Sequence, residues 1–339
     1  MRSGSLIKKL RYGYSFLRKR LVHVNLQVDY ACNFRCQICD FWKEGYRDRP
    51  RMSLGQIEGI VDKLKSAGPQ VVSIGGGEPL MHPDIIPMAR AISRDNFSAM
   101  ICNGWFVTPD IAGQLFSAGM YEISISLDYA NPEKHDRQRG VKGAFDRAVK
   151  ALKTLHEARV RPEQRVHMIS VVMDDNIDEI EPLIKLAREI GVTYLVTFYS
   201  DNRGNKPPRH SDRDVSAHLM GLKKRYPEFV ALRGYLKRFT EAAANGGIYP
   251  CQAGRNLLNI DSQGNVTFCI DHLEQPAGNI LTDPLEQILA KLDGQRRENT
   301  CRGCWTSCRG TIESLMYGGN YAGNLYDLRQ MTRDVALVK

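Results

Sequence analysis

Between residues 22 and 200, the pattern of hydrophobic and polar positions switches repeatedly between the period of a strand and that of a helix. Runs at strand spacing begin near Val22, Val71, Ser98, Tyr121, Val166 and Tyr194. Runs at helical spacing separate them and predict helices over residues 53–67, 84–94, 108–118, 143–158 and 176–190. Six strands that alternate with helices indicate parallel pairing through right-handed crossovers.

We therefore predict an α/β fold, a partial (β/α)6 TIM-like barrel, because six strands are too few to close an eight-stranded barrel. The active site of such a fold lies at the carboxyl ends of the strands. We expect residues 1–21 to form a basic amphipathic helix, residues 22–200 the barrel core and residues 201–248 a helical connector. Residues 249–339 are predicted to form a small cysteine-rich domain with a hairpin, a helix near residues 285–292 and a polar tail.

The composition is that of an ordinary globular chain, with 42% hydrophobic and 25% charged residues among 339. No run of about 18 uncharged apolar residues occurs in the sequence, which excludes a membrane-spanning helix. The first residues lack the apolar core of a secretory signal, so we expect a cytoplasmic protein. The net charge of +9 fits nucleic acid, anionic lipid, an acidic substrate or only a basic soluble surface.

The first segment combines an apolar stripe with a run of basic residues. Residues 4–20 show helical spacing, and the stripe comprises Leu6, Leu10, Tyr14, Leu17 and Leu21. Six basic residues and no acidic one lie between Lys8 and Arg20. Such a helix is typical of peripheral contact with an anionic membrane. The alternative, which we favour because Gly13 weakens an isolated helix, is that the stripe packs across the bottom or open edge of the barrel.

Nine cysteines indicate metal binding, because disulfides are the weaker explanation without a secretory signal. Eight of them fall in two groups, Cys32, Cys36 and Cys39 near one end and Cys251, Cys269, Cys301, Cys304 and Cys308 near the other. The first group has the spacing C-x3-C-x2-C directly after a strand. Three thiolates on one loop hold three irons of a four-iron cluster and leave the fourth open. A structural zinc site would need a fourth ligand, which no nearby histidine or cysteine provides.

This triplet resembles the hallmark of the radical S-adenosylmethionine (SAM) superfamily, in which it follows the first barrel strand. The second strand is followed by Gly75, Gly76, Gly77 and Glu78, which are similar to the family's loop that holds the amino group of SAM. Glycines let backbone groups approach a ligand, and Glu78 accepts hydrogen bonds from an ammonium group. The resemblance implies further SAM contacts, at Ser126 and Asp128 on the ribose side, at Arg139 on the carboxylate and, as a weaker candidate, at Ser170. For Arg139, a surface ion pair is the alternative.

The second group resembles the SPASM extension, which carries auxiliary iron–sulfur clusters in this superfamily. A full extension has more cysteines than these five, so the chain is similar to the shortened form, called twitch, with a single [4Fe–4S] cluster. The resemblance implies Cys251, Cys269 and Cys301 as ligands, while Cys304 and Cys308 compete for the fourth place. The thiol left over is a candidate hydrogen donor. A zinc ribbon or knuckle is the alternative, since it also uses C-x2-C spacing.

The resemblance predicts an enzyme in which a [4Fe–4S] cluster cleaves SAM and a 5′-deoxyadenosyl radical abstracts hydrogen from an unactivated carbon. It implies an electron donor such as flavodoxin or ferredoxin. We favour oxidation assisted by the auxiliary cluster, with redox-neutral epimerisation as the alternative. Only 31 residues precede Cys32, too few for a domain that binds a peptide leader, which favours a small molecule, sugar or lipid, or a peptide recruited by another protein.

Two other classes compete with this enzyme. A zinc-dependent nucleic-acid-binding protein would use the positive charge, but it leaves the glycine loop unexplained and the chain has no basic stripe interleaved with aromatic residues. We therefore expect no nucleic acid as a partner. An iron–sulfur electron carrier is the other class, and the intact SAM loop argues against it.

Overall fold

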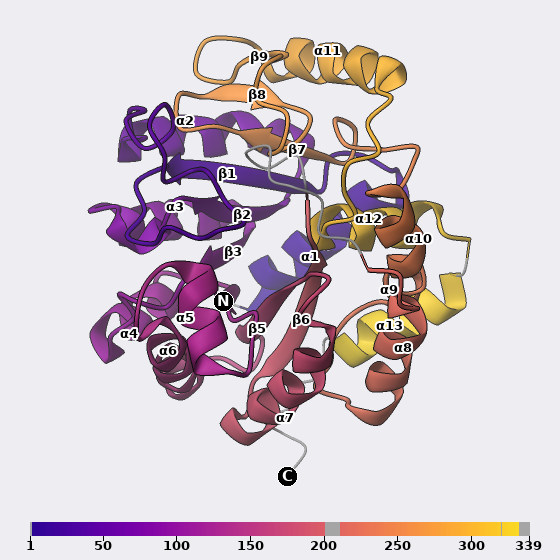
Figure 1. The fold of residues 1–339 in the computed structure, drawn as a ribbon. Coiled ribbons are helices and arrows are strands. Elements are labelled where there is room, and N and C mark those ends of the chain that lie inside the picture. Colours follow the sequence, from indigo (N-terminus) through magenta and orange to yellow (C-terminus); the bar gives the residue numbers. More distant parts are fainter. Residues whose placement is uncertain (1, 201–210, 320, 332–339) are drawn as a thin grey trace.

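Six parallel strands form the core of the computed structural model, which describes residues 2–200, 211–319 and 321–331. They are β1 (His23–Asp29), β2 (Val71–Gly76), β3 (Phe97–Cys102), β4 (Glu122–Ser126), β5 (Arg165–Val172) and β6 (Thr193–Phe198). Each strand pairs in parallel with the next along the chain, and helices connect them (Figure 1). The predicted α/β fold with its partial barrel is confirmed.

The helices of the barrel follow the predicted positions. They are α2 (Leu54–Leu64), α3 (Ile85–Asp95), α4 (Pro109–Ser117), α6 (Ala144–Ala158) and α7 (Ile180–Ile190). Ser53 caps α2 and Thr108 caps α4, each with its side chain accepting a backbone N–H of the first turn. One more helix, α5 (Pro132–Arg139), was not predicted, because its eight residues include no large hydrophobic side chain from which a period is read.

The C-terminal hairpin extends the barrel sheet, a pairing that the sequence did not predict. β7 (Leu257–Ile260) lies parallel to β1, and β8 (Asn265–Thr267) and β9 (Gly278–Asn279) follow antiparallel. The sheet therefore has the order β6-β5-β4-β3-β2-β1-β7-β8-β9. The C-terminal region also reaches the other edge of the barrel, because the Ser307 N–H donates to Thr197 Oγ1 of β6 at 3.0 Å.

The predicted helical connector contains three helices, α8 (Val215–Arg225), α9 (Arg233–Leu236) and α10 (Phe239–Asn245). The segment after Pro284 is more helical than predicted, and it begins with α11 (Leu285–Glu298), which follows the hairpin. The tail predicted to be polar contains α12 (Ser307–Tyr317) and α13 (Tyr321–Met331). The prediction was wrong here because α12 buries polar residues, Arg309 and Glu313, beside Ile312 and Met316, which hides its hydrophobic period.

Helix α1 (Arg2–Leu17) packs on the barrel through the face opposite to the one predicted. Ser15 is buried, and Tyr12 and Phe16 pack against the core, with the Tyr12 ring 5.4 Å from that of Phe97. The stripe expected to pack is exposed from Leu6 to Leu17, and only Leu21, beyond the helix, is buried. The expected packing was wrong because Tyr12, not the leucines of α1, meets Phe97 at the start of β3. In the described ranges no helix has the length and apolarity needed to cross a bilayer.

Candidate functional site

The first cysteine group lies on the loop that follows β1, at the carboxyl end of that strand. Cys36 is buried, and Cys32 and Cys39 are half-buried. All three pack in one small apolar cluster with Phe34, and the same cluster includes Trp105. Burial raises the pKa of the Cys32 thiol to about 12. Three thiols of one loop, gathered in an apolar wall, are a donor set that fits a cluster held by three cysteines.

The glycine loop after β2 packs against the first residues of the cysteine loop. A Cβ at Gly76, whose φ is +122°, would lie 2.0 Å from the Asp29 carbonyl oxygen, and one at Gly77 would lie 2.1 Å from that of Ala31. The Gly77 N–H donates to Asp29 O at 2.9 Å, and the Glu78 N–H donates to Ala31 O at 2.8 Å. Gly76 and Gly77 therefore let this loop approach the chain's own backbone, and the contact of the glycines with SAM stays a prediction.

Glu78 is 1% exposed and receives two backbone hydrogen bonds. Leu80 N–H donates to Oε1 at 3.0 Å, and Asn103 N–H donates to Oε2 at 2.7 Å. Burial raises the pKa of this carboxyl to about 7, although both hydrogen bonds oppose the shift. Glu78 therefore ties the loop after β2 to the loop after β3, and each oxygen keeps a second lone pair for another donor.

Arg139 and Asp128 form a buried ion pair beside the cysteine loop. Arg139 Nη2 lies 2.6 Å from Asp128 Oδ2, and Arg139 Nη1 donates to Cys36 Sγ at 3.9 Å. The exposed fractions of the two side chains, 8% and 0%, exclude the surface ion pair that was the alternative for Arg139. The guanidinium is thus placed between a carboxylate and a thiol that would be anionic in a metal site. Val171 N–H also donates to Asp128 Oδ1 at 2.8 Å.

The two serines proposed from the sequence lie in different surroundings. Ser126 ends β4 and is half-buried, at the carboxyl edge of the sheet. Ser170, on β5, is fully buried and donates its hydroxyl to the Leu127 carbonyl. The structure therefore commits Ser170 to the backbone of the neighbouring strand connection.

The second cysteine group is assembled from three separate segments. Cys251 follows α10, Cys269 follows β8, and Cys301 and Cys304 precede α12. Burial raises the pKa of Cys251 to about 12 and that of Cys304 to about 11. Burial also raises the pKa of Cys269, and the negative charge of Cys304 adds to the upward shift of both Cys251 and Cys269. Thiols that gather in this way fit an anionic iron–sulfur cluster.

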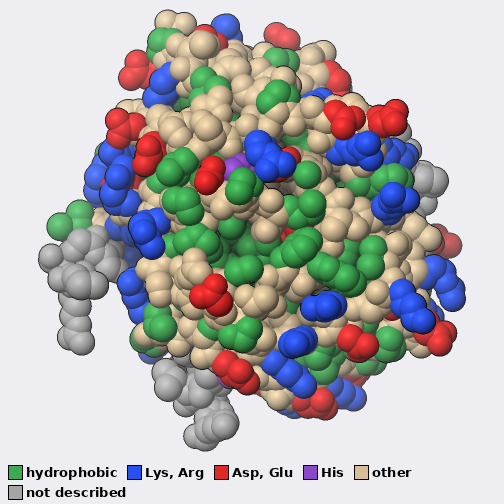
Figure 2. All heavy atoms as spheres, turned by 90° about the vertical axis from the view of Figure 1, so that its left-hand side faces the viewer, with side chains coloured by type: hydrophobic (Ala, Val, Ile, Leu, Met, Phe, Trp, Pro, Cys, Tyr) green, Lys and Arg blue, Asp and Glu red, His purple; other side chains and the backbone are tan. Residues whose placement is uncertain are grey.

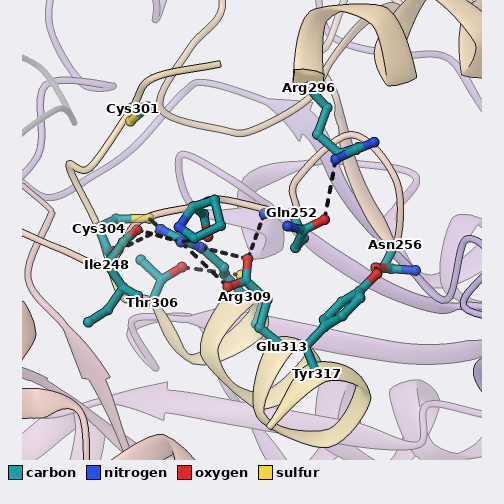
Figure 3. Close-up of polar contacts among 12 residues, drawn as sticks. Ile248, Gln252, Asn256, Arg296, Cys301, Cys304, Thr306, Arg309, Glu313 and Tyr317 are labelled. Atoms are coloured by element: carbon teal, nitrogen blue, oxygen red, sulfur yellow. Dashed lines mark hydrogen bonds and ion pairs between the residues drawn. The ribbon is translucent and has the colours of Figure 1, made fainter. Parts of the chain in front are cut away.

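Arg309, on the first turns of α12, connects two of these segments, the one before Cys251 and the one with Cys304 (Figure 3). Its guanidinium, 3% exposed, donates to the carbonyl oxygens of Cys304 at 2.8 Å, Ile248 at 2.6 Å and Pro250 at 3.1 Å. Nη1 also lies 3.8 Å from Cys304 Sγ, and Nε donates to Glu313 Oε1 at 2.8 Å. Burial acts to lower the pKa of Arg309, but nearby acidic groups hold it above the usual value.

Sequence reasoning missed both Arg309 and Glu313. The Glu313 carboxylate accepts the Gln252 N–H at 2.8 Å, so the ion pair reaches the segment of Cys251 as well. The i, i+4 spacing of the two residues was a signal for an ion pair on a helix. It was not used because no helix was predicted there.

The remaining two cysteines of this group have other partners. Cys301 Sγ lies 3.2 Å from His272 Nε2 and accepts the Gly303 N–H at 3.4 Å. Burial acts to raise the pKa of Cys301, but His272 and this N–H hold it below the usual value. Cys308 Sγ lies 3.5 Å from Thr306 Oγ1, at the start of α12. Within the described ranges, no three His, Cys, Asp or Glu side chains are placed to hold a single metal ion.

Both parts of the chain match family models. Residues 27–187 match the radical SAM superfamily, and residues 251–305 match an iron–sulfur cluster-binding domain of the SPASM type. The first match contains the cysteine loop, the glycine loop and the Asp128–Arg139 pair. The second contains Cys251, Cys269, Cys301 and Cys304. Together they indicate a SAM-binding [4Fe–4S] cluster and auxiliary iron–sulfur binding, which agrees with the two donor sets described above.

Similarity to known proteins extends over most of the chain. It is 30% identical over 308 residues to mycofactocin maturase MftC of Mycolicibacterium smegmatis, covering 84% of this chain and 76% of that protein. It is 27% identical over 280 residues to the AdoMet-dependent heme synthase of Methanosarcina barkeri, covering 76% and 79%. Among solved structures, SuiB of Streptococcus suis bound to precursor peptide SuiA has the same fold, with a TM-score of 0.66 at 17% identity over 87% of this chain and 71% of that one. The chain belongs to the radical SAM superfamily and is a radical SAM enzyme with a SPASM domain.

Proposed function

We propose that the chain is a maturase that oxidises an unactivated carbon of a peptide. The observation that carries this proposal is the 30% identity to mycofactocin maturase MftC along 84% of the chain. The heme synthase of Methanosarcina barkeri is less similar, at 27%. A peptide substrate replaces the small molecule, sugar or lipid that the short segment before Cys32 favoured.

In this proposal Cys32, Cys36 and Cys39 hold the SAM-binding cluster. Arg139, 3.9 Å from Cys36 Sγ, balances the negative charge of the thiolates. Glu78 and Ser126 face SAM, since both lie at the carboxyl ends of their strands. We leave Ser170 out of the SAM contacts, because its hydroxyl already donates to Leu127 O.

For the auxiliary cluster we propose Cys251, Cys269, Cys301 and Cys304 as ligands. Cys304 takes the fourth place because its thiol is buried near Cys251 and Cys269 and next to Arg309. Cys308 is then the spare thiol. When bound, the first cluster would pass an electron from an external donor to SAM and so supply the 5′-deoxyadenosyl radical that takes one hydrogen atom from the substrate. The auxiliary cluster would accept the electron that leaves the substrate with a proton in dehydrogenation.

The protein's own contribution is to bind the peptide over the barrel mouth and to exclude water there. Figure 2 shows the face of the molecule that lies on the left in Figure 1. Hydrophobic side chains gather at its centre, and Lys, Arg, Asp and Glu side chains surround them. An apolar centre with a charged rim suits an extended peptide, because side chains enter the centre while the rim meets backbone and charged groups.

The test uses the full chain, reconstituted without oxygen and reduced, with SAM and peptides encoded by genes adjacent to its own. We expect 5′-deoxyadenosine together with a peptide lighter by two hydrogen atoms. A product whose mass is unchanged in H2O, and which gains one deuterium when the reaction is run in D2O, would instead show epimerisation with Cys308 as hydrogen donor. Cys308→Ala would then stop product formation. Turnover of a non-peptide alone would contradict the proposal.

A further inference from the structure

The outer face of α1 has no role in the proposed enzyme activity. Five large hydrophobic side chains are exposed on it, Leu6 (59%), Ile7 (56%), Leu10 (64%), Tyr14 (55%) and Leu17 (82%). At about 100° per residue, all five lie on the side of the helix that points away from Tyr12 and Ser15. Single exposed hydrophobics are ordinary, but five along one helix form a contiguous patch that marks an interaction surface.

Basic residues border this patch along both of its long sides. Lys9 lies on one side at helical spacing, and Arg11 and Arg18 lie on the other. All three are exposed. The sequence has no acidic residue before Asp29, so nothing on α1 offsets their charge. An apolar stripe between two rows of basic side chains is the pattern of a helix that lies in the plane of an anionic membrane.

The contacts of α1 hold this patch in a fixed orientation. Lys8 Nζ donates to the carbonyl oxygens of Ser93 at 3.1 Å and Asn96 at 3.0 Å, at the end of α3. Beyond the helix, Asn256 Nδ2 donates to Lys19 O at 2.7 Å. Since Asn96 directly precedes β3, α1 lies at the amino ends of the strands. The patch therefore lies at the end of the barrel opposite to the loop that carries Cys32, Cys36 and Cys39.

A hollow of about 1120 Å³ adjoins α1 on the same side of the barrel. The charged part of its lining is mainly basic, with Lys8, Lys9, Arg90, Arg94 and Arg161 against Glu58 and Glu163. A basic hollow beside an apolar stripe has room for anionic headgroups while the stripe enters the acyl boundary.

We propose that α1 docks the enzyme on an anionic lipid surface, with the leucines of the patch inserted and Lys9, Arg11 and Arg18 at the phosphates. A protein partner fits the same face less well. Protein interfaces are enriched in aromatic residues and depleted of lysine at their centres. Here Tyr14 is the one aromatic side chain of the patch, beside three leucines and Ile7, while Tyr12 and Phe16 are turned towards the barrel. The proposal does not depend on the proposed peptide substrate.

The test measures cosedimentation of the full chain with vesicles of phosphatidylglycerol and phosphatidylcholine, and with phosphatidylcholine alone. We expect binding to the anionic vesicles at low salt, and weaker binding at high salt because salt screens the charges. Leu10→Asp with Leu17→Asp should lower the partition coefficient at least about tenfold. Both side chains are more than half exposed, so the fold does not depend on them. Tyr326→Asp, an equally exposed position on α13, is the matched control and should bind normally.

The charge requirement is tested by reversing Lys9, Arg11 and Arg18 to Glu. The control reverses three exposed lysines elsewhere, Lys150, Lys153 and Lys224, which changes the net charge equally. Only the first set should abolish binding. Three results would overturn the proposal: no binding of the unmodified chain, equal binding to neutral vesicles, or unchanged binding of the leucine variant. A dimer in solution that the leucine variant dissociates, without lipid binding, would assign the patch to a second copy of the chain.

Discussion

Each of the two cysteine groups has a buried arginine beside it, but the two arginines differ in what else they contact. In each, a buried arginine lies within 4 Å of a cysteine sulfur and pairs with a carboxylate, Arg139 with Asp128 and Arg309 with Glu313. The first group occupies one loop of eight residues, Cys32 to Cys39, and its arginine only adds charge from outside. The second group is drawn from three segments, and its arginine also holds two of them together, through the backbone carbonyls of Ile248, Pro250 and Cys304.

The difference shows which site depends on the tertiary structure. A loop with C-x3-C-x2-C spacing brings its thiols together through local chain geometry, after a strand that the barrel fixes. The second group exists only when the hairpin, the end of α10 and the start of α12 are packed. Removing charge should therefore disturb the first site locally, whereas the same removal should loosen the whole C-terminal region.

The largest expected effect is the loss of SAM cleavage, which should follow replacement of the first cysteine group and not of the second. Replacing Cys32, Cys36 and Cys39 together by Ala should abolish SAM cleavage and remove about one four-iron cluster, leaving the auxiliary iron. Replacing Cys251, Cys269 and Cys304 should do the reverse, with loss of auxiliary iron and retention of reductive SAM cleavage to 5′-deoxyadenosine. Iron analysis and 5′-deoxyadenosine assays measure both. Cleavage by the first variant would refute the assignment of the radical site.

Glycines at both sites should prove equally intolerant of a side chain. A Cβ at Gly76 would lie 2.0 Å from Asp29 O, and one at Gly247, with φ of +150°, would lie 1.7 Å from Arg302 O. We expect Gly76→Ala and Gly247→Ala each to cost on the order of 4 kcal/mol, from overpacking and backbone strain. Gly59→Ala, in α2 with nothing within 4 Å of its Cβ, is the control and should be neutral or stabilising. Urea unfolding of the metal-free chain gives the three values.

Replacing Arg309 is expected to lower the free energy of unfolding more than replacing Arg139, because only the Arg309 side chain also binds backbone carbonyls. Arg139→Met leaves Asp128 buried without its partner, which should cost about 3–5 kcal/mol of unfolding free energy. Arg309→Met likewise leaves Glu313 without its partner, and it also removes the donor for three carbonyl oxygens. It should therefore lower the free energy of unfolding by about 1–3 kcal/mol more than Arg139→Met. Urea midpoints of the two metal-free variants test the order. Equal losses would mean that Arg309 does not join the segments.

The smallest expected effect is a pH dependence that belongs to the first region alone. Burial lowers the pKa of His135, on α5 behind Asp128, to about 2, and the Asp128 N–H donates to its Nδ1. Because the folded state keeps this ring neutral, its contribution to stability is complete above pH 6.5 and declines as the unfolded chain takes up a proton. At pH 5.5 the loss is about 1.4 kcal/mol.

His135→Gln should flatten this acid limb of the stability curve between pH 7 and 5. In the second region the interaction with Cys301 raises the pKa of His272, so His272→Gln should not reproduce the flattening. An unchanged acid limb in His135→Gln would show that the ring is protonated in the folded chain.

The sequence by itself determined the six strands, most of their helices, the C-x3-C-x2-C loop and the hairpin with its cysteines. These features follow from local rules, since hydrophobic period, capping residues and thiol spacing act over a few residues. The resemblance to the radical SAM superfamily rested on the same local signals. Helix α5 lacked such a signal, because its charged residues carry no hydrophobic period.

Only the tertiary structure decided how distant segments meet. The pairing of β7 with β1 and the insertion of Arg309 among the carbonyls of Ile248 and Pro250 join residues far apart in sequence. The face by which α1 packs was decided by the aromatic pair of Tyr12 and Phe97, 85 residues apart, and not by the apolar stripe. A helical period shows which side chains share a face, but the surface that the helix meets determines which face is buried.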